Sequence, residues 1–209
     1  MTTADFLTCV VTEMHTTVIA TVDDRGLPVT CAIDMMDSDE NSLYFLTAKG
    51  KAFYDRLKKR EYVALTGLKG GNTMSCAAIS IHGKVREIGG NRLARLFEKN
   101  PYMNEIYPTV SSRGILSVFQ IYEGTGEWFD LSKKPIERLS FSFGNDVRVT
   151  QGYFITDKCI ACKACKTACP QNCIDFTAAP AVIRQENCLH CGNCAALCRQ
   201  NAVVWKGMP

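Results

Sequence analysis

Apolar and polar residues alternate in short runs along the first 131 residues, and turn-forming residues separate the runs. Runs of this kind cover residues 17–23, 27–36, 43–47, 62–68 and 74–87. Two further runs, 115–122 and 127–131, flank Gly124-Thr125-Gly126, which predicts a hairpin that turns at these glycines. Strands this short and numerous predict a small antiparallel barrel.

Helical spacing interrupts this alternation in three places. Residues 52–60 place apolar side chains on one face and end in three cations, which suit the negative end of a helix dipole. Asn91 is predicted to cap a helix that continues through Lys99. Thr2 or Thr3 is predicted to cap a short N-terminal helix. The expected fold class is therefore α+β.

The pattern changes after residue 150, where nine of the twelve cysteines fall. They include two runs with the spacing C-x2-C-x2-C-x3-C, Cys159, Cys162, Cys165 and Cys169, then Cys188, Cys191, Cys194 and Cys198. Bacterial ferredoxins use this spacing, and the fourth cysteine of each run binds the other cluster. We therefore assign one [4Fe-4S] cluster to Cys159, Cys162, Cys165 and Cys198, and a second to Cys188, Cys191, Cys194 and Cys169.

The two runs form an internal repeat, because every cysteine of the first run recurs 29 residues later. Two equal halves that cannot bury a core separately predict one small pseudo-twofold module. Cys173 aligns with Ala202, so we interpret Cys173 as a small core residue and not as a ligand. The predicted domains are residues 1–149, a barrel with a connecting segment, and residues 150–209, a two-cluster ferredoxin-like domain.

Two other uses of the cysteines fit the pattern less well. Zinc binds four thiolates, but its usual patterns pair two C-x2-C knuckles. A disulfide framework needs an oxidising compartment. The first residues carry Asp5 and lack the basic region of a signal peptide, and no apolar run approaches the roughly 18 residues of a membrane helix. We therefore expect a cytoplasmic protein without a membrane segment.

The formal net charge of +3 does not predict a nucleic-acid-binding surface. Residues 1–150 hold 18 basic and 18 acidic side chains, so the excess lies in the cysteine-rich part. An oxidised cubane with four thiolates carries about two negative charges, and two such clusters bring the total to roughly −1. We expect no nucleic-acid partner.

The order of features in the first part of the chain resembles a known family. That order is Gly26-x-Pro28, a strand, a polar turn, Phe45-x-Thr47 and a helix that starts at Lys51-Ala52. It is similar to the pyridoxamine 5'-phosphate oxidase-like FMN-binding split barrels, over roughly residues 10–130. The resemblance implies an antiparallel split β-barrel, a bound FMN and a homodimer that builds the flavin site across its interface.

The resemblance also implies which residues contact FMN. The flavin ring lies along the strand stretch Thr30, Cys31, Ala32 and Ile33, and near the strand end Leu46 and Thr47. Lys51 holds the phosphate with help from Lys49, which is reasonable physically because free amides at a helix N-terminus and an ammonium group both attract anions. Taken without this context, the two lysines are ordinary solvated charges and Cys31 is a small buried residue.

Three positions differ from the vitamin oxidase after which the family is named. Cys31 replaces its arginine, Met36 replaces its substrate-binding lysine, and Ala78 replaces a flavin-contacting glutamine. Synthesis of pyridoxal phosphate is therefore not the expected activity.

The combination of parts predicts a redox protein. An external low-potential donor reduces the two clusters, the clusters reduce FMN, and FMN reduces a small organic acceptor. The alternative is a non-enzymatic electron carrier between partner proteins, and a third interpretation is a flavin-storage or redox-sensing module. A cavity above the flavin ring that fits a substrate would favour the enzyme over the carrier.

Overall fold

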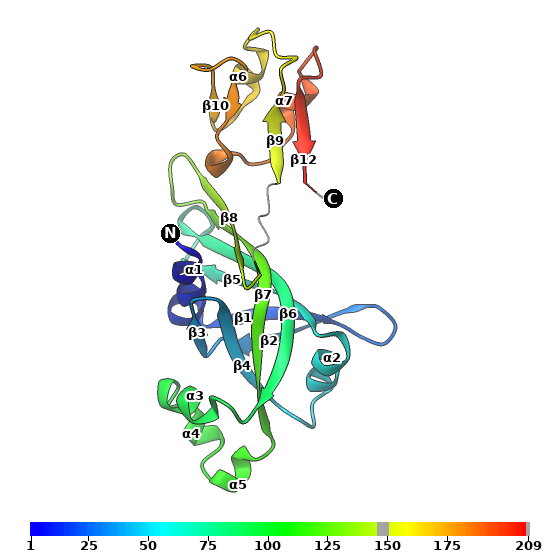
Figure 1. Ribbon diagram of the computed structural model, residues 1–209. Helices are drawn as coiled ribbons and strands as arrows, with labels where there is room; N and C mark the ends of the chain where they lie inside the picture. The colour runs from blue at the N-terminus through cyan, green and yellow to red at the C-terminus, as the bar shows by residue number, and fades with distance from the viewer. Residues whose placement is uncertain (146–150, 208–209) are drawn as a thin grey trace. The chain divides into compact units, whose positions relative to one another are not determined.

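The computed structural model describes residues 1–145 and 151–207, and the chain divides into two compact units (Figure 1). The first unit holds residues 1–69 and 78–127 together with the end of strand β8. The second unit holds the C-terminal segment together with residues 70–77 and 128–140. Each unit is described by itself below.

One antiparallel sheet of eight strands forms the first unit and extends into the β7–β8 hairpin. The strands are β1 (Thr16–Val22), β2 (Pro28–Asp34), β3 (Asp37–Asp39), β4 (Ser42–Ala48), β5 (Tyr62–Lys69), β6 (Ala77–Gly89), β7 (Leu116–Asp130) and β8 (Glu137–Phe143). Their order is β2-β1-β5-β6-β7-β4-β3, and β8 pairs with β7. The sheet curls into the split β-barrel, so the predicted α+β class is confirmed.

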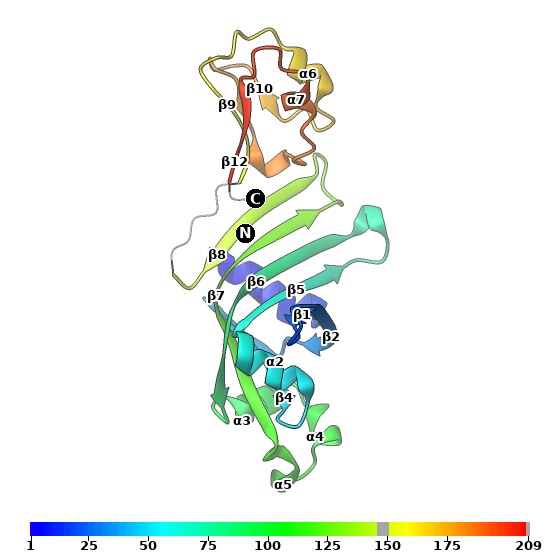
Figure 2. The same ribbon diagram turned by 90° about the vertical axis from the view of Figure 1, so that its right-hand side faces the viewer.

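The first unit also contains several helices. They are α1 (Thr3–Cys9), a π-helix (Val10–Met14), α2 (Ala52–Arg60), α3 (Leu93–Lys99), α4 (Met103–Ile106) and α5 (Val110–Arg113). The last three gather at one end of the long strands β6 and β7 (Figures 1 and 2). Helix α2 packs against β1 and β4 and buries Phe53 and Leu57, the face that its sequence pattern predicts.

Aromatic and aliphatic side chains fill the barrel between β4, β7 and the helices. The Phe45 and Phe119 rings stack with centroids 5.7 Å apart, and both side chains are buried. Leu96 and Phe97 of α3 pack with Tyr44 in a second apolar cluster. Apolar side chains of the strands and helices therefore pack together in the interior of the first unit.

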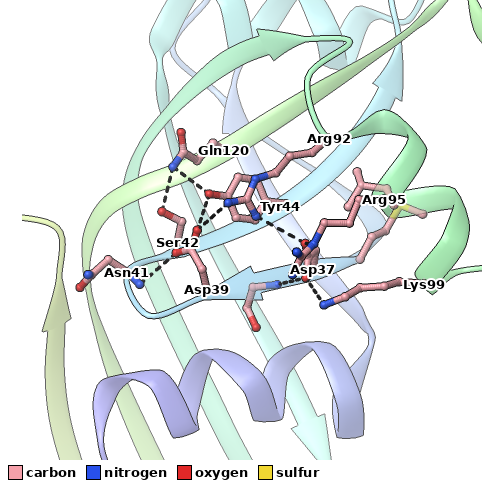
Figure 3. Close-up of polar contacts among 12 residues, drawn as sticks. Asp37, Asp39, Asn41, Ser42, Tyr44, Arg92, Arg95, Lys99 and Gln120 are labelled. Atoms are coloured by element: carbon pink, nitrogen blue, oxygen red, sulfur yellow. Dashed lines mark hydrogen bonds and ion pairs between the residues drawn. The ribbon is translucent and has the colours of Figure 1, made fainter.

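A buried ionic network attaches α3 to the edge of the sheet (Figure 3). Asp37 is fully buried on β3, and its carboxylate accepts a 2.6 Å hydrogen bond from Arg95 Nε and another from Lys99 Nζ. Arg92 bridges Asp37 and Asp39, and its guanidinium lies 3.9 Å from the Tyr44 ring centroid. A buried carboxylate needs such partners, because desolvation of an unpaired charge is costly.

Strand β7 corrects the predicted hairpin at Gly124-Thr125-Gly126. It runs without interruption from Leu116 to Asp130, and the hairpin lies further on, between β7 and β8. The glycines are needed for close packing instead of for a turn. A Cβ on Gly124 would lie 2.5 Å from the carbonyl oxygen of His82, and one on Gly126 would lie 2.3 Å from the Phe141 ring.

One of the two predicted helix caps is present and the other is not. Thr2 caps α1 in a capping box with Asp5, as the sequence indicates. The prediction of Asn91 as a cap is wrong. Arg92 occupies the N-cap position of α3 in a left-handed conformation. Its guanidinium has no acceptor for the first amides and is bound instead to Asp37 and Asp39.

The C-terminal segment contains two short two-stranded sheets and two short helices. The strands are β9 (Gly152–Ile155), β10 (Ile174–Asp175), β11 (Val182–Ile183) and β12 (Val203–Lys206), and the helices are α6 (Ala164–Ala168) and α7 (Asn193–Ala196). β9 pairs with β12 and β10 with β11, so each half of the repeat contributes one strand to each sheet. Left-handed backbone conformations recur at the 29-residue interval, in the pairs Ala161 and His190, Lys163 and Gly192, and Asn172 and Asn201. The predicted pseudo-twofold module is present.

No helix in the described ranges is long and apolar enough to cross a membrane.

We predict that Asp37→Asn lowers the free energy of unfolding by about 2 kcal/mol at neutral pH, because three cations lose their buried counter-charge. Burial opposes ionisation of Asp37, but its bonds to Arg95 and Lys99 dominate and hold the pKa of Asp37 below its ordinary value. A lowered pKa in the folded state stabilises the protein above the unfolded value of about 3.9, and this contribution disappears as the pH falls through the folded value. Urea unfolding should therefore show the two proteins converging in acid.

The control is Asp24→Asn, which removes an exposed ion pair with Lys59. It should change stability by less than about 1 kcal/mol at any pH. Equal effects of the two substitutions would contradict the structural role of Asp37.

Candidate functional site

Four cysteines from both halves of the repeat line one cavity in the second unit. They are Cys159, Cys162, Cys165 and Cys198, the set that the spacing predicts for the first cluster. Ile155, Phe176 and Val203 line the same cavity. Four thiols around one apolar cavity fit a cubane, whose cluster needs four thiolates and protection from water.

A second cavity repeats this arrangement with the other four predicted cysteines. Cys169, Cys188, Cys191 and Cys194 line it, together with Tyr153, Ile174 and Ile183. The fourth cysteine of each run thus lies with the three cysteines of the other run. This exchange is the arrangement predicted from the spacing.

Backbone amides point at the exchanged cysteines in both halves. The amide of Ala202 donates to Cys198 Sγ at 3.3 Å, and the amide of Cys173, its repeat partner, donates to Cys169 Sγ at 3.4 Å. Burial opposes ionisation of Cys198, but this amide and neighbouring ones lower the pKa of the Cys198 thiol. Amide donors of this kind favour the thiolate form that binds iron.

Cys173 distinguishes the second cavity from the first. Its side chain is buried in the wall of the second cavity, and its Sγ lies 3.4 Å from Cys169 Sγ. The first cavity has Ala202 at the equivalent place. Cys173 is therefore a fifth thiol beside the four predicted ligands.

In the first unit, the residues implied for FMN lie on β2, β4 and the start of α2. Thr30 and Ala32 are exposed on β2, whereas Cys31 and Ile33 are half-buried on its other face. Cys31 pairs across the sheet with Ile19 of β1, the strand against which α2 packs. Helix α2 therefore packs against β1, the strand that pairs with β2, and against β4.

The end of β4 contains a buried hydroxyl group without a partner. Thr47 is 3% exposed, and its Oγ1 has no hydrogen-bond partner among the described residues. Leu46 beside it is half-buried. An unpaired buried hydroxyl costs about 1–3 kcal/mol, so the Thr47 hydroxyl is free to bond a ligand or a water molecule.

The start of α2 is suited to an anion. Lys51 is its N-cap residue, and no side chain caps the free amides of the first turn. Lys49 and Lys51 are both exposed, and neither ammonium has an ion-pair partner within the described ranges. Free amides, the helix dipole and two cations together favour a phosphate group.

Arg56 is a further cation that the sequence interpretation missed. Its Nε donates a 2.8 Å hydrogen bond to Thr21 Oγ1 on β1. Burial raises the pKa of the Cys31 thiol, while the charges of Arg56 and Lys51 oppose this effect, which places both cations near Cys31. The sequence offered one sign that Arg56 lies close to the sheet, because it directly precedes Leu57 on the apolar face of the helix.

Comparison with protein families identifies both parts of the chain. Residues 4–129 match the family model for pyridoxamine 5'-phosphate oxidase. The chain belongs to this family. Residues 158–202 match the model for a 4Fe-4S dicluster domain. Together the two matches indicate a redox or electron-transfer protein.

Solved structures share the fold of this family member at low identity. A NimC/NimA family protein from Clostridium acetobutylicum is 19% identical with a TM-score of 0.54, over 66% of this chain and 88% of its own. A protein of the same organism related to general stress protein 26 is 16% identical with a TM-score of 0.51, over 68% and 96%. A heme binding protein from Mycobacterium smegmatis is 11% identical with a TM-score of 0.53, over 68% and 58%. No curated protein matches the chain.

We predict that Cys173→Ala retains about eight irons per chain, because four other cysteines line its cavity. Cys169→Ala should lose iron, since it removes one of those four. Iron and sulfide analysis of protein purified without air measures both variants. If Cys173→Ala lost about half of its iron while Cys169→Ala kept all of it, Cys173 would be the cluster ligand and Cys169 would not.

Proposed function

We propose that this protein is an iron-sulfur flavoprotein oxidoreductase. Two [4Fe-4S] clusters receive electrons one at a time from an external low-potential donor and pass them to FMN. When bound, FMN supplies the chemistry that turns a one-electron supply into the two-electron reduction of a small organic acceptor. The protein's own residues bind these groups and exclude water from them.

The two cysteine-lined cavities carry this proposal. Each brings the four predicted ligand cysteines together in an apolar wall, and these cysteines come from a segment that matches a 4Fe-4S dicluster domain. We assign Cys159, Cys162, Cys165 and Cys198 to one cluster, and Cys188, Cys191, Cys194 and Cys169 to the other. Residues 150–209 form the electron-entry domain in this proposal, and residues 1–149 form the flavin domain.

The FMN site is proposed on the stretch Thr30 to Ile33 and on the residues around the start of α2. The unpaired Thr47 hydroxyl donates to or accepts from the cofactor, with Leu46 beside it. Lys51, Lys49 and the first amides of α2 hold the phosphate, and Arg56 adds a third positive charge. This donor set fits an anionic cofactor with a polar ring edge.

A homodimer is proposed because the outward face of β1 and β5 is apolar and exposed. Val18 is 48% exposed, Tyr62 48% and Leu68 65%. Val18 pairs with Thr66 and Ala20 with Ala64, so small and apolar side chains form a continuous surface between the two strands. A sheet face of this kind favours association with a second copy of the chain.

The function is tested on protein purified without air. The proposal expects about eight irons, about eight sulfides and one FMN per chain, and turnover of a quinone such as menadione with reduced methyl viologen as the donor. Both cofactors without turnover of any small acceptor would favour an electron carrier. Iron without flavin would contradict the flavin site.

We predict opposite effects of Thr47→Val on the apoprotein and on FMN binding. Removing an unsatisfied buried hydroxyl should leave the apoprotein equally stable or slightly more stable. The same change should weaken FMN binding about 5- to 30-fold, the equivalent of one hydrogen bond of about 1–2 kcal/mol. Thermal unfolding of the apoprotein and fluorescence titration with FMN measure the two quantities. Unchanged FMN affinity would exclude Thr47 from the site.

Light scattering should give a mass of about twice 23.1 kDa. Val18→Lys should shift the mass towards that of one chain, whereas the control Val110→Lys, at an 85% exposed position on α5, should not. A wild-type protein with the mass of one chain would contradict the dimer.

A further inference from the structure

Three titratable side chains from distant parts of the sequence meet at the end of β2. Tyr102 donates a 2.7 Å hydrogen bond from its hydroxyl to Asp34 Oδ2. His15 Nε2 lies 3.2 Å from the Tyr102 hydroxyl oxygen and 3.5 Å from the same Asp34 oxygen. Thr16 completes the environment by donating to Asp34 Oδ1 at 2.6 Å. These contacts are made by the part of the chain that follows the π-helix, the end of β2 and the residue before α4.

The backbone of His15 is held in an unusual conformation. Its φ of 54° and ψ of −73° follow the π-helix directly, in a region that L-residues rarely adopt. Its carbonyl accepts a 2.8 Å hydrogen bond from the amide of Met35, the residue after Asp34. This conformation costs free energy and sets the imidazole beside Asp34, and such strain concentrates at functional sites.

The ionic network of Asp37 holds the segment that leads to Tyr102, because α3 carries the cations of this network and ends at Lys99. Figure 3 shows Arg95 and Lys99 of α3 directed at Asp37, which lies three residues beyond Asp34. Asn100, which is buried, donates to the carbonyl of Met36 at 3.0 Å. The chain just after Asp34 is therefore bound to the chain just before Tyr102. The phenol and the carboxylate are held in place before any ligand binds.

The electrostatics of the group favour an ionised Asp34 and a protonated Tyr102. Burial opposes ionisation of Asp34, but hydrogen bonds from Thr16 and Tyr102 and the charge of His15 lower the pKa of Asp34. Burial and the bond to Asp34 raise the pKa of Tyr102. With Nε2 engaged by these two groups, His15 Nδ1 forms no hydrogen bond within the described ranges. The imidazole is thus oriented through one nitrogen and available through the other.

We propose that His15 is the proton donor of the reaction, and that Asp34 and Tyr102 are its positioning residues. This inference rests on the proposed function, because Asp34 is the next residue after the stretch Thr30 to Ile33 proposed to line the flavin. One residue of a strand spans about 3.3 Å, so the proposal requires the acceptor to bind at the Asp34 end of that stretch. A carboxylate that orients an imidazole for proton transfer is a recurrent catalytic arrangement.

The step balances for an acceptor such as a quinone or an unsaturated ketone. Its reduction takes up two electrons and two protons. The external donor would supply the two electrons by way of the proposed cofactors, and water would supply the first proton. The Nδ1–H bond of the His15 imidazolium breaks as the second proton forms an O–H or C–H bond of the product. Neutral His15 then regains a proton from water, to which its side chain is 37% exposed.

The test compares His15→Gln with His82→Gln. His82 is a matched control, because its Nδ1 lies 2.8 Å from the Tyr62 hydroxyl and its Nε2 3.0 Å from Thr125 Oγ1. Reduced methyl viologen supplies electrons, and two acceptors are compared: menadione, which takes up protons, and ferricyanide, which does not. FMN content and the pH dependence of the flavin midpoint potential are measured on the same proteins.

We expect His15→Gln to lower the ratio of menadione to ferricyanide turnover about 10- to 100-fold. It should also change how the flavin midpoint potential depends on pH, because the substitution removes a proton-exchanging side chain. Tyr102→Phe should lower the same ratio by a smaller factor. His82→Gln should match the wild type in every readout.

An unchanged ratio in His15→Gln, or an equal fall in both histidine variants, would overturn the inference while leaving the proposed function in place. A wild-type protein without FMN would instead remove the proposed function, and the inference with it.

Discussion

The exchange of the fourth cysteine between the two halves of the C-terminal repeat is the constraint on which the cluster-binding segment depends. Its core is small, and several members of that core are the cysteines themselves, among them Cys188 and Cys194. Strands of two to four residues and helices of four or five cannot stabilise a fold alone. Binding of the proposed clusters would therefore be coupled to folding of this segment, as in other small metal-binding domains. Because Cys169 and Cys198 each line the cavity of the other run, we expect that neither half folds without its partner.

The barrel differs from the cluster-binding segment in what stabilises it. It has its own apolar core, and its polar groups lie around that core. The buried carboxylate of Asp37 holds α3, and the chain after α3 carries Tyr102 back to the end of β2. Helix α2 similarly joins β1 and β4, which brings Arg56 and Lys51 near Cys31. Among the described residues of the barrel, the polar groups without a hydrogen-bond partner include the Thr47 hydroxyl, the free amides of the first turn of α2 and His15 Nδ1. In the proposal these groups serve an anionic cofactor and an acceptor.

Sequence predicted the parts of the molecule that depend on local spacing. The cluster cysteines are close in sequence, so the spacing alone assigns them to two sets. Lys51 was proposed as a phosphate ligand through the family resemblance, which places it at the start of a helix. Contacts between distant residues were not accessible in this way. Gly124 resembles a turn residue, although it is required by the close approach of the His82 carbonyl in another strand. His15 and Tyr102 are 87 residues apart, and no local pattern connects them. Arg92 replaced Asn91 at the start of α3 because a tertiary ion pair outweighs the local capping preference.

In the proposed function, electrons pass through the clusters before they reach the flavin. Rapid mixing of the anaerobic protein with reduced methyl viologen tests this order, with freeze-quench electron paramagnetic resonance for the clusters and absorbance for the flavin. We expect cluster signals to rise before the flavin absorbance falls, and protein depleted of iron but still holding FMN to be reduced much more slowly. Flavin reduction at the same rate with and without clusters would contradict this order.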